Sequence, residues 1–241
     1  MKSKYFKITA ICLSCMLTIL TCGSCSKGDS VRKEIEKLDK AKDADVIFVA
    51  IQHETGTSCD FYAYQKKDKK LSLAWQTEGY VGRSGVTDPT NRIAGDGSSP
   101  AGVYSLGECF GIYAAPDNMS LPYTVVDNDD YWNGDSSSPT YNQHVKGSEM
   151  PDSWDPSSSE HLIEYTTSYN YCAMINFNVD PAVPGKGSCI FLHCTYPTSK
   201  SSSGCIAIPE ENMIKALQMM TEKSYIVIAS SMEDLKVVDQ Y

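Results

Sequence analysis

Two residues with the chemistry of a nucleophile and a base lie close together in the segment SCIFLHCTYPTSKSSSGCIAIPE, which spans residues 188–210. His193 ends an apolar run, and Cys205 follows a serine-rich loop twelve positions later. A free thiol has a pKa near 8.5 and is mostly protonated at neutral pH, so it needs a neighbouring base to become a nucleophile. The pair therefore predicts covalent thiol catalysis if the fold brings the two side chains together.

The residues around the pair favour such a meeting. Alternation along the predicted strand places His193 on the same side as Phe191 and opposite Cys194. The loop that follows reverses the chain, and Gly204 permits backbone geometry that other residues resist. Cys205 then leaves the loop where it can return to the strand end that carries His193.

A tetrahedral intermediate at Cys205 would also need an anion site. The backbone N–H groups of Gly204 and Cys205, in the loop with Ser203, are the candidates, and one such donor contributes about 2.7–4 kcal/mol in well-studied enzymes. The alternative is a buried strand, a solvated loop and an idle thiol, because a cysteine twelve residues after a histidine also arises by chance. Spacing alone leaves both interpretations open.

The first residues of the chain predict export. A basic start, MKSKYFK, precedes an apolar stretch of thirteen residues and then a small, polar stretch. This layout is typical of a secretory signal and is too short for a membrane-spanning helix, which needs about 20 apolar residues. We therefore assign residues 1–24 to a signal peptide. The sequence CGSC resembles a lipoprotein signal, with Cys25 as the lipid-carrying residue and Cys22 as the alternative; an ordinary secreted protein is a third interpretation.

The composition limits the partners. The formal net charge is −9, and removal of the signal peptide with its three lysines makes it more negative. Such an acidic chain repels nucleic acid and anionic lipid, so membrane attachment would depend on the lipid anchor. We expect a monomer in the cell envelope that faces the periplasm, with the outer membrane as one candidate location. The histidine and cysteine spacings match no metal site, and we expect no cofactor.

The rest of the chain predicts one mainly β domain. Residues 25–43 are charged and read as a stalk or lead-in helix, and residues 44–241 form the domain. Short β-branched and aromatic runs bounded by polar turns predict strands, whereas one helix is predicted after Pro209. We expect a β-sandwich or barrel with one short helix and a long irregular insertion over 111–168, whose aromatic residues either line a groove or anchor a loop.

The segment FLHC…SSSGCIAIPE resembles the signature of L,D-transpeptidase catalytic domains of the YkuD type. There, a histidine that closes a strand is followed by a Ser-x-Gly-Cys-hydrophobic motif. GDGSSPAGVYSLG at 95–107 resembles the upstream turn of the same family, and SPTYNQHV at 138–145 resembles a divergent branch. The similarity is good over 95–215 and loose over 45–94.

The resemblance implies that Cys205 is the nucleophile, that His193 is its base, and that the loop of Ser203 and Gly204 holds the oxyanion. It implies peptidoglycan stem peptides as substrates, cleaved before a terminal D-alanine to form a thioester that passes to an amine of another stem. Water as acceptor would make the protein an L,D-carboxypeptidase. A wall-binding lipoprotein without activity is the non-enzyme alternative. A papain-like peptidase is disfavoured because the cysteine precedes the histidine there.

Several positions depart from the family pattern. Ser203 replaces the usual histidine before the Gly-Cys pair, Ala207 replaces an arginine or asparagine, and Cys194 replaces a small residue after the base histidine. These differences bear on substrate and acceptor more than on the thiol chemistry. Further residues are weaker candidates for contact with substrate: Lys200, Tyr141, Asn142 and His144.

Overall fold

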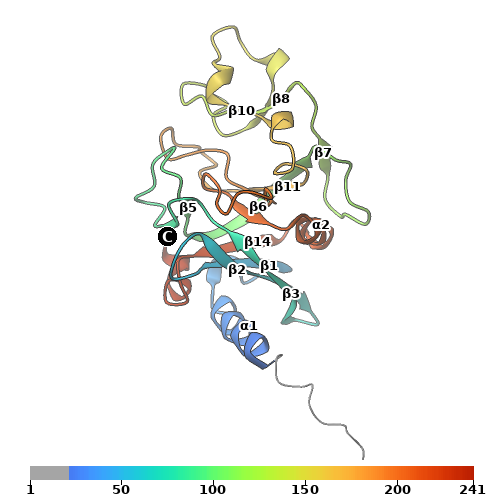
Figure 1. Cartoon of the computed structure of the whole chain (residues 1–241), viewed down its shortest axis with the longest axis vertical. Coiled ribbons are helices and arrows are strands. Elements are labelled where there is room, and N and C mark those ends of the chain that lie inside the picture. The colour runs from blue at the N-terminus through green and yellow to red at the C-terminus, as the bar shows by residue number, and fades with distance from the viewer. Residues whose placement is uncertain (1–21) are drawn as a thin grey trace, which may run out of the picture.

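A closed β-barrel forms the body of the protein (Figure 1). Nine strands make one sheet in the order β11-β12-β13-β3-β2-β1-β14-β6-β7, and a further pairing between β11 and β6 closes it, with β7 outside the closure. The strands of this sheet are β1 (Val46–Gln52), β2 (Ser58–Lys67), β3 (Lys70–Tyr80), β6 (Gly102–Gly111), β7 (Tyr123–Val125), β11 (Cys172–Ile175), β12 (Phe191–Cys194), β13 (Ile206–Ile208) and β14 (Ser224–Ala229). The prediction of a mainly β barrel with one short helix after Cys205 is confirmed.

The computed structural model describes residues 22–241, and it describes side chains from residue 27 onward. Most of the predicted signal peptide and the side chain of Cys25 lie outside the described residues. Within the part of the chain that the structure describes, no helix is both long enough and apolar enough to cross a bilayer.

Local sequence explains the strands that build the barrel. The run VIFVAIQ of β1 is rich in β-branched residues and is buried up to its last residue, which suits a central strand that pairs with β2 and β14. The β2–β3 hairpin turns at Asp68 and Lys69, both of which have positive φ. A two-residue turn of this kind matches the twist of the flanking strands.

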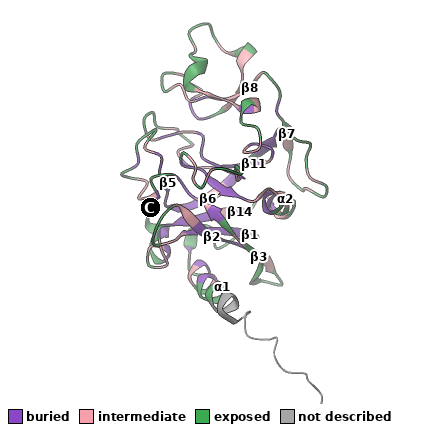
Figure 2. Cartoon of the chain, in the orientation of Figure 1, coloured by how far each residue is buried: buried purple, intermediate pink, exposed green. Residues whose placement is uncertain are grey.

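Three apolar clusters divide the core, and Figure 2 shows the buried residues concentrated in the barrel strands. The first fills the barrel interior and includes helix α2 (Glu210–Met219), whose Met213 and Leu217 are fully buried. The second lies on the outer face of β1, β2 and β14. There it buries Val31 and Ile35 of helix α1 (Cys22–Ile35) together with Leu38. The charged segment before the barrel thus packs against the barrel through its apolar side chains.

The third cluster joins the outer face of β11 and β12 to the insertion. The insertion is no featureless loop. It carries a small sheet of β8 (Asp130–Trp132), β9 (His144–Lys146) and β10 (Glu160–His161) in the order β10-β8-β9. Figure 1 shows it at the opposite end of the molecule from α1.

Short elements complete the fold. A two-stranded sheet pairs β4 (Val86–Thr87) with β5 (Ser99–Pro100). Single 3-10 turns span Asp39–Ala41, Gly147–Glu149, Pro156–Ser158, Leu162–Glu164, Asp234–Lys236 and Val238–Gln240.

Candidate active site

Two parallel neighbouring strands position the predicted pair. In the β12–β13 pairing, Leu192 lies opposite Ile206 and His193 lies opposite Ala207. Leu192 and Ile206 point into the barrel interior. Because side chains alternate along a strand, His193 and Cys205 therefore lie on the outer face, under the insertion.

Both side chains line one cavity of about 640 Å³. Its floor is the outer face of β12 and β13. Its walls come from the segment before β5, the end of the insertion, and the loops that precede β12 and β13: residues 92, 94–95, 157–160, 165, 168–169, 187–190, 199 and 201–203. The insertion thus builds one wall of the site that contains His193 and Cys205.

The Cys205 thiol is held in its neutral form. Its Sγ donates to the carbonyl oxygen of Cys189 over 3.2 Å and accepts from the amide of Phe191 over 3.3 Å. Burial, and after it the charge of Glu160, raises the pKa of this thiol to about 12, while the positive charge of Arg92 acts in the opposite direction. The resting cavity therefore favours the thiol over the thiolate.

His193 is buried and neutral. Its Nδ1 lies 2.8 Å from the carbonyl oxygen of Cys194, so Nδ1 carries the proton and Nε2 has the free lone pair. Burial lowers the pKa of this imidazole to about 4, against a smaller opposing effect of the hydrogen bond to Cys194. A neutral imidazole with a fixed tautomer can accept a proton at neutral pH.

Glu160 is a residue of the cavity that the sequence did not point to. It comes from β10 of the insertion, and its carboxyl accepts a hydrogen bond from the hydroxyl of Tyr169. The Tyr169 ring in turn packs edge-on against His193, with ring centroids 5.6 Å apart. Burial raises the pKa of Glu160 to about 7, although the hydrogen bond from Tyr169 opposes the shift. No local pattern around SSSEH signals this placement.

Arg92 is the second missed residue. Its side chain is 2% exposed and lines the same cavity. The Nε donates to the carbonyl oxygen of Ser98 over 3.0 Å, and the guanidinium carbon lies 5.1 Å from the ring centre of Phe177. The surrounding sequence is turn-rich and polar, which gives no sign of a buried arginine.

The loop before Cys205 is braced by hydroxyl groups. The Gly204 amide donates to Ser202 Oγ over 3.0 Å, and the Gly204 carbonyl oxygen accepts from Ser99 Oγ over 2.7 Å. The predicted oxyanion donor at Gly204 is thus already engaged in this structure. Ser203 lies exposed at the cavity wall.

The weaker substrate candidates lie elsewhere. Tyr141 and Asn142 border a different cavity, and neither they nor His144 line the one that contains Cys205. The Lys200 side chain does not line it either, although the Lys200 carbonyl oxygen accepts a hydrogen bond from Thr57.

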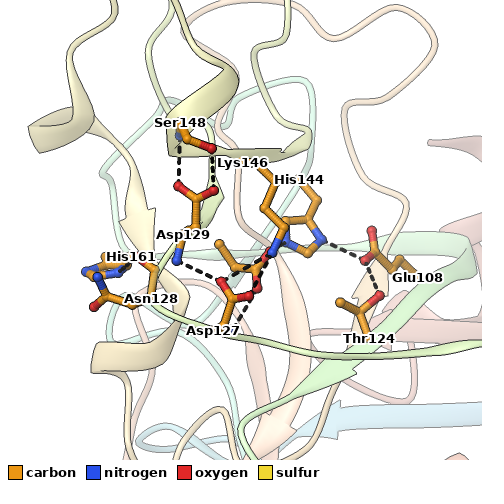
Figure 3. Close-up of polar contacts among 10 residues, drawn as sticks. Glu108, Thr124, Asp127, Asn128, Asp129, His144, Lys146, Ser148 and His161 are labelled. Carbon is orange, nitrogen blue, oxygen red and sulfur yellow. Dashed lines mark hydrogen bonds and ion pairs between the residues drawn. The ribbon is translucent and has the colours of Figure 1, made fainter.

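His144 belongs to a polar network that ties the insertion to the barrel (Figure 3). Its Nδ1 lies 2.7 Å from Glu108 of β6, and its Nε2 lies 3.0 Å from Asp130 of β8. Burial alone would lower the pKa of His144, but these two carboxylates raise it above its ordinary value. The Nζ of Lys146 lies 2.8 Å from Oδ1 of the same Asp130.

Asn142 has a structural position under the site. Its side chain accepts from Trp132 Nε1 and from the Cys189 amide, and it donates to the carbonyl oxygens of Phe177 and Asn178. It therefore fixes the segment whose carbonyl oxygen accepts the Cys205 thiol hydrogen bond.

The described cysteines and acids form no metal centre. The six cysteines from Cys59 to Cys205 are all free and buried. Among the residues from 22 onward, no group of three or more histidine, cysteine or acidic side chains is arranged to hold a metal ion.

Comparisons with known proteins agree with the resemblance. Residues 60–228 match the family profile of the YkuD L,D-transpeptidase catalytic domain. No curated protein sequence matches the chain significantly.

Two solved structures resemble the chain over part of their length. One is described as the structure of Bdellovibrio bacteriovorus Bd1075, with 11% identity, a TM-score of 0.39 and coverage of 82% of this chain and 54% of the other. The other is described as the Ldtfm-avibactam carbamoyl enzyme, with 15% identity, a TM-score of 0.35 and coverage of 78% and 49%. The chain thus spans about half the length of these two solved chains.

Proposed function

Because this chain belongs to the L,D-transpeptidase catalytic domain (YkuD) family, we propose that it is a cysteine-dependent L,D-transpeptidase that acts on peptidoglycan stem peptides. One observation carries the proposal: Cys205 and His193 line a single cavity, and His193 keeps its Nε2 lone pair free because Nδ1 is bound to Cys194. A nucleophile and a base with a fixed tautomer are the two parts that acyl transfer to a thiol requires.

The first half-reaction forms a thioester. His193 Nε2 takes the thiol proton as Cys205 Sγ attacks the carbonyl carbon before the terminal D-alanine, and the C–S bond forms. The tetrahedral intermediate then breaks its C–N bond, and the amine of D-alanine leaves with the proton from His193. The acyl group of the stem is now held as a thioester on Cys205.

The second half-reaction releases the stem. An amine of another stem attacks the thioester and loses its proton to His193, and the thiol of Cys205 is restored as the new amide forms. Water in place of the amine would give a shortened stem, which is L,D-carboxypeptidase activity at the same site.

The electrostatics of the resting cavity imply that substrate binding must activate the thiol. A thiol with a pKa of about 12 beside an imidazole with a pKa of about 4 does not form an ion pair spontaneously. Proton transfer therefore has to accompany attack on the carbonyl, with charge stabilised as it develops. The high pKa of the thiol also supports the alternative of an inactive wall-binding protein, in which the thiol keeps its hydrogen bond to the carbonyl oxygen of Cys189.

The location proposed for the protein is the cell envelope, facing the periplasm, held by a lipid on Cys25. Lipid anchoring would place the cavity near the wall without a basic surface, which the acidic composition does not provide. We propose that it acts there as a monomer on stem peptides and has no nucleic-acid partner.

Incubation of the purified protein with tetrapeptide muropeptides tests the function. Mass spectrometry should show D-alanine release together with new cross-linked dimers, and both should vanish in Cys205→Ala. Cys172→Ala removes a buried thiol of the same apolar cluster that does not line the cavity, so it is the matched control and should keep activity. Release without dimers would identify a carboxypeptidase. Neither product from a folded protein would favour the inactive alternative.

A further inference from the structure

Arg92 carries a buried charge that its ion pair with Asp96 compensates only in part. Its side chain is 2% exposed, and the nearest carboxylate oxygen, Asp96 Oδ1, lies 3.8 Å from Nε. Nε donates to Ser98, but the buried Nη1 has no hydrogen-bond partner. Because leaving a buried polar or charged group unpaired is costly, such a group in a native fold requires an explanation.

The backbone around Arg92 is shaped to fit the guanidinium. Gly187 has a φ of +106°, and a Cβ there would lie 2.6 Å from Arg92 Nη1. Gly204 has a φ of +142°, and a Cβ there would lie 2.9 Å from Arg92 Nη2. The two glycines belong to the loops that lead into Cys189 and Cys205. The guanidinium is thus wedged between the two loops that hold the thiol.

The orientation of Arg92 is also fixed. The hydrogen bond from Nε to Ser98 and the Phe177 ring beneath the guanidinium leave Nη1 and Nη2 as the remaining donors. A rigid pair of parallel N–H donors matches the two oxygens of a carboxylate, and a lysine could not supply it.

The charge of the cavity favours an anion although the whole chain is acidic. Arg83 contributes a second guanidinium to the wall. Among the described residues that line the cavity, Glu160 is the one carboxyl group, and its pKa of about 7 leaves it partly protonated at neutral pH. Ala207, which also lines the cavity, offers no charge.

We propose that Arg92 binds a carboxylate of the peptide substrate beside Cys205, with Nη1 and Nη2 donating to its two oxygens. The inference rests on the proposed function in that the cavity is taken as the acyl-transfer site. It assigns to Arg92 the role of a specificity-determining residue, and it assigns to the substrate an anionic group next to the scissile bond.

A set of stem peptides tests the proposed contact directly. In each peptide of the set, one carboxylate is replaced by a carboxamide. The wild type should prefer the carboxylate form at one position by about 10- to 100-fold in kcat/KM, as expected for a charged hydrogen-bonded pair. Arg92→Met should abolish that preference, and Arg92→Lys should keep part of it. Equal losses on every peptide would overturn the inference, because Arg92 would then act on the thiol or the fold and not on a carboxylate.

An alkylation measurement tests the same site without any transpeptidase activity. Iodoacetate and iodoacetamide both lose iodide to a thiolate as a C–S bond forms, but only iodoacetate carries a carboxylate. We expect the ratio of their rates at Cys205, measured by mass spectrometry of the Cys205 peptide, to exceed the ratio for a small free thiol by about 10-fold. In Arg92→Met the ratio should fall to that of the free thiol.

The two measurements separate the two proposals. An Arg92-dependent alkylation ratio in a protein that never releases D-alanine would sink the transpeptidase function and leave the anion site standing. Turnover of muropeptides with a wild-type ratio equal to that of the free thiol would overturn the anion site alone. The ratio of the two alkylation rates in the wild type needs no variant. It therefore tests the anion site even if Arg92→Met fails to fold.

Discussion

The Sγ of Cys205 donates to the carbonyl oxygen of Cys189 over 3.2 Å, and no hydrogen bond joins it to His193. The thiol is therefore turned toward the backbone that precedes β12 and not toward its proposed base, His193. Nucleophilic attack therefore requires the hydrogen bond between the Cys205 thiol and the Cys189 carbonyl oxygen to break.

Alkylation of Cys205 should accordingly be slow at neutral pH. Because burial holds its pKa near 12, the rate with iodoacetamide should keep rising steeply with pH beyond 9, where the rate for a small free thiol with a pKa near 8.5 is already levelling off. Rates at Cys205 are measured by mass spectrometry between pH 6 and about 10. A plateau near pH 8 would show that the thiolate of Cys205 forms easily and would contradict a pKa raised by burial.

The protonation of His193 should determine how kcat/KM falls at acid pH. A neutral His193 is required, and its pKa is about 4, so kcat/KM should fall as the pH drops through about 4 and not through the ordinary value near 6.5. His193→Gln should lower kcat by about 10²- to 10⁴-fold. His161→Gln is the control, since His161 lies outside this cavity. An acid limb near 6.5 would mean that the imidazole is more exposed than the fold shows.

Glu160 should make stability depend on pH. Its folded pKa of about 7 lies above the ordinary 4.5, so the folded protein binds more protons than the unfolded chain between these values. The stabilisation is complete below about pH 4.5 and is lost as the pH rises through 7. In urea unfolding, the free energy of unfolding of Glu160→Gln relative to the wild type should rise by about 3 kcal/mol between pH 4.5 and 8.

The control for this experiment is Glu149→Gln, an exposed carboxyl in the same insertion. Its stability difference from the wild type should stay within about 0.5 kcal/mol at every pH. A difference for Glu160→Gln that does not change with pH would show that Glu160 is solvated in the folded protein.

Asn142→Ala should destabilise the protein by about 3 kcal/mol, because it leaves the Trp132 indole, the Cys189 amide and two carbonyl oxygens without their partner. Thermal or urea unfolding measures the loss. Gln143→Ala changes the exposed neighbour and should cost less than about 0.5 kcal/mol. Equal effects of the two substitutions would argue against Asn142 as the anchor of the insertion.

Gly204→Ala should disrupt the site. The new Cβ would lie 2.8 Å from the Ser98 carbonyl oxygen and 2.9 Å from Arg92, in addition to the cost of a positive φ. Gly56 also has a positive φ but has open space around it, so Gly56→Ala measures the backbone cost alone. Gly204→Ala should lose about 1–3 kcal/mol more stability than Gly56→Ala. The comparison fails if both variants unfold at the same urea concentration.

Local patterns were sufficient wherever short-range geometry decides the outcome. The alternation in SCIFLHC correctly separated Ile190 and Leu192 from Phe191 and His193, because successive side chains of a strand point to opposite faces. The apolar stripe after Pro209 likewise predicted α2. The YkuD resemblance, carried by residues near Cys205, is confirmed by the family match over 60–228.

What the amino-acid sequence determined by itself was therefore a mainly β barrel, the strand of His193 and the loop of Cys205, since these depend on periodicity and on turn residues close in the chain. The tertiary structure alone decided what surrounds them. Arg92 and Glu160 reach the cavity from segments far from Cys205 in sequence. The periodicity of side chains within one segment carries no information on contacts between distant segments. Asn142, singled out as a candidate for substrate contact, instead anchors the insertion, because burial and hydrogen-bond partners are properties of the folded chain.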